Sequence, residues 1–95
     1  MITTGLTRKP RQVLVCGHVV KIRCRQKIRG GHLGYFDADA NEIYIANDAK
    51  WKEHLLHEIL HAVLFYSGQS ERMKENEEES LVRAIENGLK TLGFT

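Results

Sequence analysis

Residues 41–66 read N-E-I-Y-I-A-N-D-A-K-W-K-E-H-L-L-H-E-I-L-H-A-V-L-F-Y, and this stretch decides the fold because its hydrophobic period changes within it. Ile43 and Ile45 share one face of an expected strand over 42–46, since alternate residues of a strand point the same way. Asp48 is the expected N-cap of the helix that follows, and Gly68 its expected stop. Over 49–66 the apolar residues recur every three or four positions, which predicts an amphipathic helix; they are Leu56, Ile59, Leu60, Val63 and Leu64.

The chain on either side of this stretch predicts further strands and one more helix. Residues 13–16 and 19–28 are rich in β-branched and apolar residues, and 33–36 is expected to form a hairpin with 42–46. The order of strands followed by helices predicts an α+β fold, with a small antiparallel or mixed sheet packed on the first helix. The second helix is expected from about 70 or 76 to 92, with a buried stripe of Leu81, Val82, Ile85, Leu89 and Leu92.

Length and composition predict a single domain over residues 1–95, because chains divide into domains only at greater lengths. The longest apolar stretch is interrupted by His61, so we expect no membrane span. Residues 1–10 contain no apolar segment of the kind that a signal peptide needs, which favours a cytoplasmic location. Cys16 and Cys24 allow at most one disulfide, and we expect both to be reduced thiols in the core.

Charge is distributed unevenly along the chain, although the net charge is only +2. Residues 1–36 contain eight Lys or Arg and no acid, whereas all twelve acids lie in 37–95. Such asymmetry occurs at surfaces that bind nucleic acid or an acidic partner, but a solvated strand face opposite acidic helices carries the same pattern and is the more common cause. No aromatic residue interleaves with the cations of the expected 19–28 strand, which argues against stacking on single strands. The cations are Lys21, Arg23, Arg25 and Lys27 in this strand and Arg29 directly after it, and we call these five residues the basic strand.

The motif with the clearest chemistry is H-E-I-L-H, formed by residues 57–61 in the middle of the first expected helix. Positions four residues apart share a helix face, so the imidazoles of His57 and His61 can bind one metal ion. Zinc accepts neutral imidazole and lowers the pKa of a bound water to about 7. Glu58 lies beside the pair and is the expected general base for attack of that water on a carbonyl.

The third metal ligand is not fixed by the motif. The longer zincin pattern requires a glycine and a third histidine, but Leu64 and Ser67 stand at those positions. A carboxylate from the next helix is the remaining solution, and Glu77, Glu78 and Glu79 are the candidates. Helical periodicity favours Glu78, because it lies on the expected buried stripe. Asn76 and Glu79 also have the spacing of a capping box, which would give Glu79 a purely structural role.

Residues 34–92 resemble small phage-type zinc metallopeptidases of the ImmA/IrrE kind. The resemblance rests on N-E-I-Y-I-A-N, L-L-H-E-I-L-H-A-V-L and E-E-S-L-V-R-A-I-E-N-G-L, of which the H-E-x-x-H-A block is the most specific. It implies a minimal gluzincin-like fold, with a curled sheet packed on the H-E-x-x-H helix and a ligand helix beside it. It also implies that Glu79 is the third ligand. Some members of that family cleave DNA-binding repressor proteins.

Several residues near the motif are candidates for supporting roles. His54 lies one turn before His57, but three ligands from one straight helix cannot easily surround an ion, so we expect it to support the site or lie on the surface. An oxyanion could be stabilised by His32, Tyr35 or Tyr66, and the sequence does not choose between them.

The motif predicts a zinc-dependent metallopeptidase in which His57 and His61 hold Zn²⁺ and Glu58 is the catalytic base, and the resemblance implies Glu79 as the third ligand. Its substrate would be a protein or peptide that adds as an extra strand to the 42–46 strand, which is the expected exposed sheet edge. The alternative function is a nucleic-acid-binding module that uses the basic strand, with a structural or vestigial zinc site.

Overall fold

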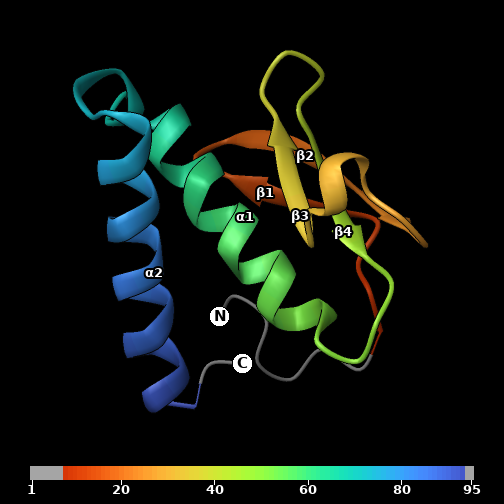
Figure 1. Ribbon diagram of the computed structural model, residues 1–95. Coiled ribbons are helices and arrows are strands. Elements are labelled where there is room, and N and C mark those ends of the chain that lie inside the picture. The colour runs from red at the N-terminus through yellow and green to blue at the C-terminus, as the bar shows by residue number, and fades with distance from the viewer. Residues whose placement is uncertain (1–7, 94–95) are drawn as a thin grey trace.

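The computed structural model describes residues 8–93, although the side chain of Arg29 lies outside what it describes (Figure 1). Within these residues, four strands come first and are followed by two helices. Short 3-10 helices at Arg29–Gly31 and Ser70–Arg72 lie in the connections. The main elements are β1 (Gln12–Val15), β2 (His18–Arg25), β3 (Gly34–Asp37), β4 (Glu42–Ala46), α1 (Trp51–Tyr66) and α2 (Glu75–Thr91). The expected α+β class is therefore confirmed.

The strands form one mixed, curled sheet with the order β1-β2-β4-β3 (Figure 1). β1 pairs with β2 and β3 pairs with β4 in antiparallel fashion, whereas β2 and β4 run parallel. The 33–36 and 42–46 hairpin is thus present, with β3 one residue later than expected. The expectation that 42–46 is an exposed edge is wrong, because β4 lies between β2 and β3 and the edges of the described sheet are β1 and β3.

The structure has three layers, with α1 packed between the sheet and α2 (Figure 1). One side of α1 buries Leu55, Ile59 and Ala62 against the apolar face of the sheet. The other side of α1 buries a second, smaller cluster against α2, made of Leu56, Leu60 and Val82. Apolar residues spaced three and four apart can serve two layers at once because they cover adjacent sides of the helix. The helix that carries H-E-x-x-H is consequently held from both sides.

The ends of α1 differ partly from expectation. The N-cap is Lys50 and not Asp48, whose Oδ1 accepts a hydrogen bond from the Lys50 backbone N–H at 2.8 Å. The helix ends at Tyr66, and Gly68 follows in a left-handed conformation with φ of 82°, as a helix stop requires. Among residues 8–93, no helix is both long enough and apolar enough to cross a membrane.

The second helix has a narrower buried stripe than the sequence predicts. Only Val82 is fully buried, whereas Leu81 and Ile85 are more than a third exposed and Leu92 is largely exposed. The reason is that α2 packs mainly on α1 in an outer layer, so only a narrow part of its surface is covered. The capping box also differs, since the Lys74 backbone N–H donates to Glu77 Oε1 at 2.8 Å.

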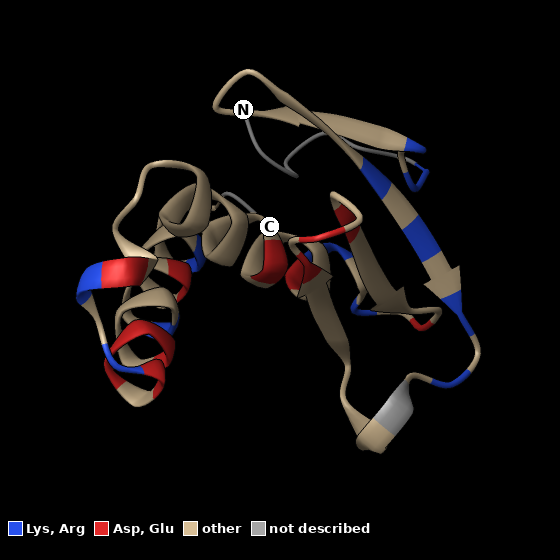
Figure 2. Ribbon diagram, turned by 90° about the horizontal axis from the view of Figure 1, so that it is seen from above, with Lys and Arg blue, Asp and Glu red and all other residues tan. Residues whose placement is uncertain are grey.

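The first half of the chain departs from expectation in two further respects. β2 ends at Arg25, so the basic strand retains only Lys21, Arg23 and Arg25 as strand residues. Lys27 lies in a bend and Arg29 in a 3-10 helix. Both cysteines are free, as expected, but Cys16 is exposed and Cys24 is only partly buried, so the core placement of Cys16 is wrong. Figure 2 shows the Lys and Arg residues along β2 and many of the acids on the two helices.

Candidate metal centre

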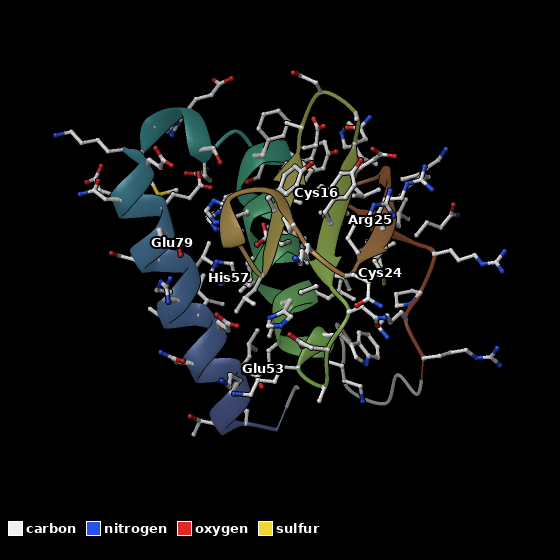
Figure 3. All side chains as sticks on the ribbon, turned by 45° about the vertical axis from the view of Figure 1, so that its right-hand side comes forward. Cys16, Cys24, Arg25, Glu53, His57 and Glu79 are labelled. Atoms are coloured by element: carbon white, nitrogen blue, oxygen red, sulfur yellow. The ribbon has the colours of Figure 1, made fainter. Side chains whose placement is uncertain are left out.

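The H-E-x-x-H residues lie on α1 where it faces α2 and the beginning of β3 at Gly34. His57 and His61 are one helical turn apart, and their ring centroids are 5.0 Å from each other. Both imidazoles turn toward α2, where Glu79 lies across from them, and Figure 3 shows Glu79 and His57 on facing sides of the two helices. The expected i, i+4 convergence of the two histidines is therefore present.

Glu79 completes a compact group of three donors. Its Oε1 lies 3.1 Å from His57 Nε2 and 2.8 Å from His61 Nε2, so one carboxylate oxygen meets the same nitrogen of both rings. One donor atom from each of the three side chains lies within 4.8 Å of the others, so the group could hold a metal ion. The other oxygen, Oε2, forms an ion pair with Arg83 Nη2 at 2.9 Å, so both oxygens of this carboxylate have partners.

Two further glutamates hold the far sides of the histidine rings. Glu78 Oε2 lies 2.6 Å from His61 Nδ1, and Glu86 Oε1 lies 2.9 Å from His57 Nδ1. Carboxylates in this position fix the ring orientation and keep Nε2 free for a metal. Glu78, which periodicity favoured as a ligand, thus contacts the opposite nitrogen. Glu86 was missed in the sequence, although its spacing of seven residues from Glu79 places the two on one helix face.

Charge around the histidines is strongly negative, which suits a cation. Burial alone would lower the pKa of His61, but hydrogen bonds to Glu78 and Glu79 outweigh it and raise that pKa. Partial burial would raise the pKa of Glu79, but the hydrogen bond with His61 and the two nearby imidazoles hold this pKa below its ordinary value. Three carboxylates therefore surround two imidazoles, and the pKa shifts favour positive charge between them.

The Glu58 side chain lies against Gly34 of β3, lines the same cleft as the ligand group and is only 7% exposed. Burial raises the pKa of its carboxyl to about 7, against the opposing influence of His57 and His61. Space for this side chain depends on Gly34, because a Cβ built there would lie 3.1 Å from Glu58 Cγ and 3.0 Å from the Tyr44 carbonyl oxygen. Nothing in the sequence around Gly34 pointed to this role, since the close approach arises from the packing of β3 over α1.

An open cleft of about 910 Å³ gives access to these groups. β3 and the residues before it form one wall, α2 forms the other, and α1 forms the floor. Of the three candidates for oxyanion stabilisation, His32 and Tyr35 line the cleft. Tyr66 does not line it, because its ring stacks on His18 and its hydroxyl donates to Asn41 Oδ1.

His54 lies outside the three-donor group, as expected, but it is buried and contacts Asp48, so it neither lies on the surface nor contacts a ligand of the group. It is 8% exposed, and its Nε2 lies 2.9 and 3.0 Å from the two carboxylate oxygens of Asp48. The hydrogen bond to His54 is also the main reason why the pKa of Asp48 is below its ordinary value. The pair ties the segment before α1 to its first turns.

A scan against protein-family models finds no match for this chain, and searches among curated proteins and solved structures find no significant match either. The function is therefore inferred from the chemistry of the site itself.

Proposed function

We propose that this protein is a zinc-dependent metallopeptidase with minimal zincin-like packing, in which His57, His61 and Glu79 bind the metal and Glu58 is the general base. The observation that carries the proposal is the meeting of both Nε2 atoms at one Glu79 oxygen, at 3.1 and 2.8 Å, on the floor of an open cleft. A buried carboxylate next to this group supplies the second requirement of hydrolysis, a base with a pKa near 7.

The donor set fits zinc. Two imidazole nitrogens and one carboxylate oxygen are the ligands of catalytic zinc sites that keep one position open. The carboxylates of Glu78 and Glu86 on the two Nδ1 atoms match the usual support of histidine ligands. Zinc bound here would act as a Lewis acid on the substrate carbonyl and would acidify a bound water.

The chain's own residues then account for proton movement. Glu58 takes a proton from the attacking water on a carboxylate oxygen and returns it to the nitrogen of the leaving amine. Glu78 and Glu86 keep the histidine rings from rotating, so their Nε2 atoms stay in place during turnover. His32 lines the cleft, and its side chain can donate a hydrogen bond to the developing oxyanion, whereas the Tyr35 ring is stacked on Tyr44.

The substrate is a peptide segment in an extended conformation. β3 is an edge of the sheet and also borders the cleft, so its free backbone groups can pair with a substrate strand beside Glu58. Substrate pairing is therefore proposed on β3 and not on the 42–46 strand, because both sides of that strand are already paired.

The first test is metal content measured by elemental analysis on purified protein. We expect about one zinc per chain, strong loss in His57→Ala and in Glu79→Gln, and retention in Glu71→Gln. Glu71 is an exposed acid outside the cluster, so its variant is the matched control. Glu78→Gln should weaken binding less than Glu79→Gln, because Glu78 touches Nδ1. Equal zinc in all variants would refute the site.

The second test is hydrolysis of a fluorescence-quenched peptide library by the zinc-loaded protein. Glu58→Gln should retain zinc and lose cleavage, by about 10²-fold or more for loss of a general base. Cleavage by this variant at the wild-type rate would contradict the assignment of the base. Zinc binding without cleavage of any library member would favour a structural site.

A further inference from the structure

The sheet has a second face that no described element covers. α1 packs on the face that carries Val20, Ile22, Ile43 and Ile45, and α2 packs mainly on α1. Side chains alternate along a strand, so the intervening residues point to the opposite side. We call this opposite side the open sheet face, made of Lys21, Arg23, Arg25, Tyr35, Glu42 and Tyr44.

Two tyrosines lie beside the basic strand on this face. Register pairs Arg23 with Tyr44 and Tyr44 with Tyr35 across three neighbouring strands. The two tyrosine rings are stacked, with centroids 4.7 Å apart and planes 10° from parallel. The guanidinium of Arg25 lies 5.4 Å from the centroid of the Tyr44 ring. No aromatic residue lies within the basic strand itself, but β4 and β3 place Tyr44 and Tyr35 beside it in the sheet. The sequence-based argument against stacking on single strands therefore does not hold.

The cations of the open sheet face are not equally free. Arg23 is held by Glu42, with its Nε and Nη2 atoms 3.0 and 2.9 Å from Glu42 Oε2. Glu42 Oε1 accepts a hydrogen bond from the Tyr44 hydroxyl at 2.9 Å, so this acid is already occupied by its neighbours. Within residues 8–93, Lys21 and Arg25 form no ion pair, and both are exposed. They lie four residues apart on one strand, or roughly 13 Å.

We propose that the open sheet face binds single-stranded nucleic acid, with Lys21 and Arg25 on phosphates and the outer face of Tyr35 stacked on a base. Tyr35 is 38% exposed, and only one of its ring faces is occupied by Tyr44. Rigid aromatic rings beside unpaired cations on a strand are what a flexible polyanion with free bases requires. A duplex hides its bases and would contact the cations alone, so it should bind more weakly. The inference does not depend on the metal centre.

The test is fluorescence anisotropy with labelled mixed-sequence single-stranded DNA and single-stranded RNA of about 12 nucleotides, and with the DNA duplex as a comparison. The protein is held in chelator, which keeps cleavage chemistry out of the measurement. We expect binding of one or both single strands near 50 mM salt, and weaker binding as salt rises. Absence of binding to both strands at low salt, or tighter binding of the duplex, would overturn the proposal. Comparison of the two strands identifies the preferred sugar.

Charge removal tests the phosphate contacts. The double variant Lys21→Gln/Arg25→Gln should lower the slope of log affinity against log salt by about 1.4, since each contact with a single strand contributes about 0.7. The matched control is Arg72→Gln/Lys74→Gln, which removes two exposed cations from the segment before α2. If the control variant changes the slope equally, the nucleic acid is attracted by the overall positive charge of the protein and not by Lys21 and Arg25, and the assignment is overturned.

The tyrosine variants separate stacking from charge. Tyr35→Ala should weaken binding roughly 5- to 150-fold, the range measured for loss of one base-stacking ring, whereas Tyr35→Phe should bind like wild type. Thermal unfolding of each variant checks that the fold is intact. The Phe variant retains the aromatic ring, so it can still be tested for wild-type binding if the Ala variant does not fold. If the Ala and Phe variants bind with equal affinity, whether like wild type or more weakly, stacking on this ring is refuted.

Discussion

Replacing Glu58 by glutamine should stabilise the metal-free protein, and by more as the pH rises. The side chain is 7% exposed, and burial raises its pKa to about 7 from an ordinary value of 4.5. Above the ordinary value the unfolded chain loses this proton while the folded chain retains it. The native state then binds more protons than the unfolded state, so its stability falls as the pH rises between these two values. Glutamine has nearly the same shape and does not ionise.

The magnitude follows from the interval between the two pKa values. From 4.5 to about 7 the free energy of unfolding decreases by roughly 3 kcal/mol, at 1.36 kcal/mol for each pKa unit. Near pH 5 less than about 1 kcal/mol of this cost is present, and near pH 8 it is complete. Glu58→Gln should therefore exceed wild type in stability by under about 1 kcal/mol near pH 5 and by roughly 3 kcal/mol near pH 8.

Urea unfolding in chelator at both pH values measures the difference directly. The exposed Glu71→Gln variant is the control, and its stability relative to wild type should change little with pH. A constant difference between Glu58→Gln and wild type, or a destabilised variant near pH 8, would refute the link between burial and ionisation. The same outcome would also weaken the case that this carboxylate is tuned to act as a base near neutral pH.

Three further predictions concern the surroundings of the site. Glu86→Gln should weaken zinc binding about 10- to 100-fold in a competition titration, because it loosens His57 without removing a ligand, and unchanged affinity would contradict that role. Gly34→Ala should lower stability by about 1 to 3 kcal/mol in urea, since the new methyl group would lie 3.0 Å from a backbone oxygen, and a neutral result would show that β3 can shift. Val82→Ala should cost about 2 kcal/mol in the same assay and more than Ile85→Ala, because Val82 is fully buried, and equal costs would argue against the α1–α2 core.

The sequence predicts best those features that depend on local period. The 42–46 strand agrees with β4 at both ends, and α1 begins two residues later than expected and ends at the expected residue. The H-E-x-x-H convergence follows from helix geometry alone, which needs no knowledge of other elements. Local hydrogen bonding and side-chain direction decide these features, so a short stretch of sequence contains the information.

Features that depend on pairing between distant segments could not be predicted in this way. The parallel pairing of β2 with β4 places β4 inside the sheet, and no turn or spacing in the sequence specifies that neighbour. The choice between Glu78 and Glu79 depends on the rotation of α2 against α1. Periodicity locates the centre of the buried stripe at Val82, but the histidines lie beside that stripe and meet Glu79. The tyrosine pair on the open sheet face has the same origin, because three strands must be aligned first.

The two contact regions of α2 link metal binding to helix packing. α2 docks on α1 in two ways. It contributes one fully buried residue, Val82, to a small apolar cluster, and its acidic side chains contact His57 and His61. Docking also places Glu79 and Glu86 near Glu58 of α1, whose pKa is raised by burial and further by these two carboxylates. This repulsion opposes docking unless positive charge lies between them. A cation at the three-donor group would remove this repulsion and bind only when α2 is docked. By mass action, such an ion would stabilise the docked arrangement by an amount that rises with the logarithm of its concentration divided by its dissociation constant. A sheet and a single outer helix could therefore suffice for a site of this kind in a short chain, since a bound ion would itself supply part of the free energy that holds α2 on α1.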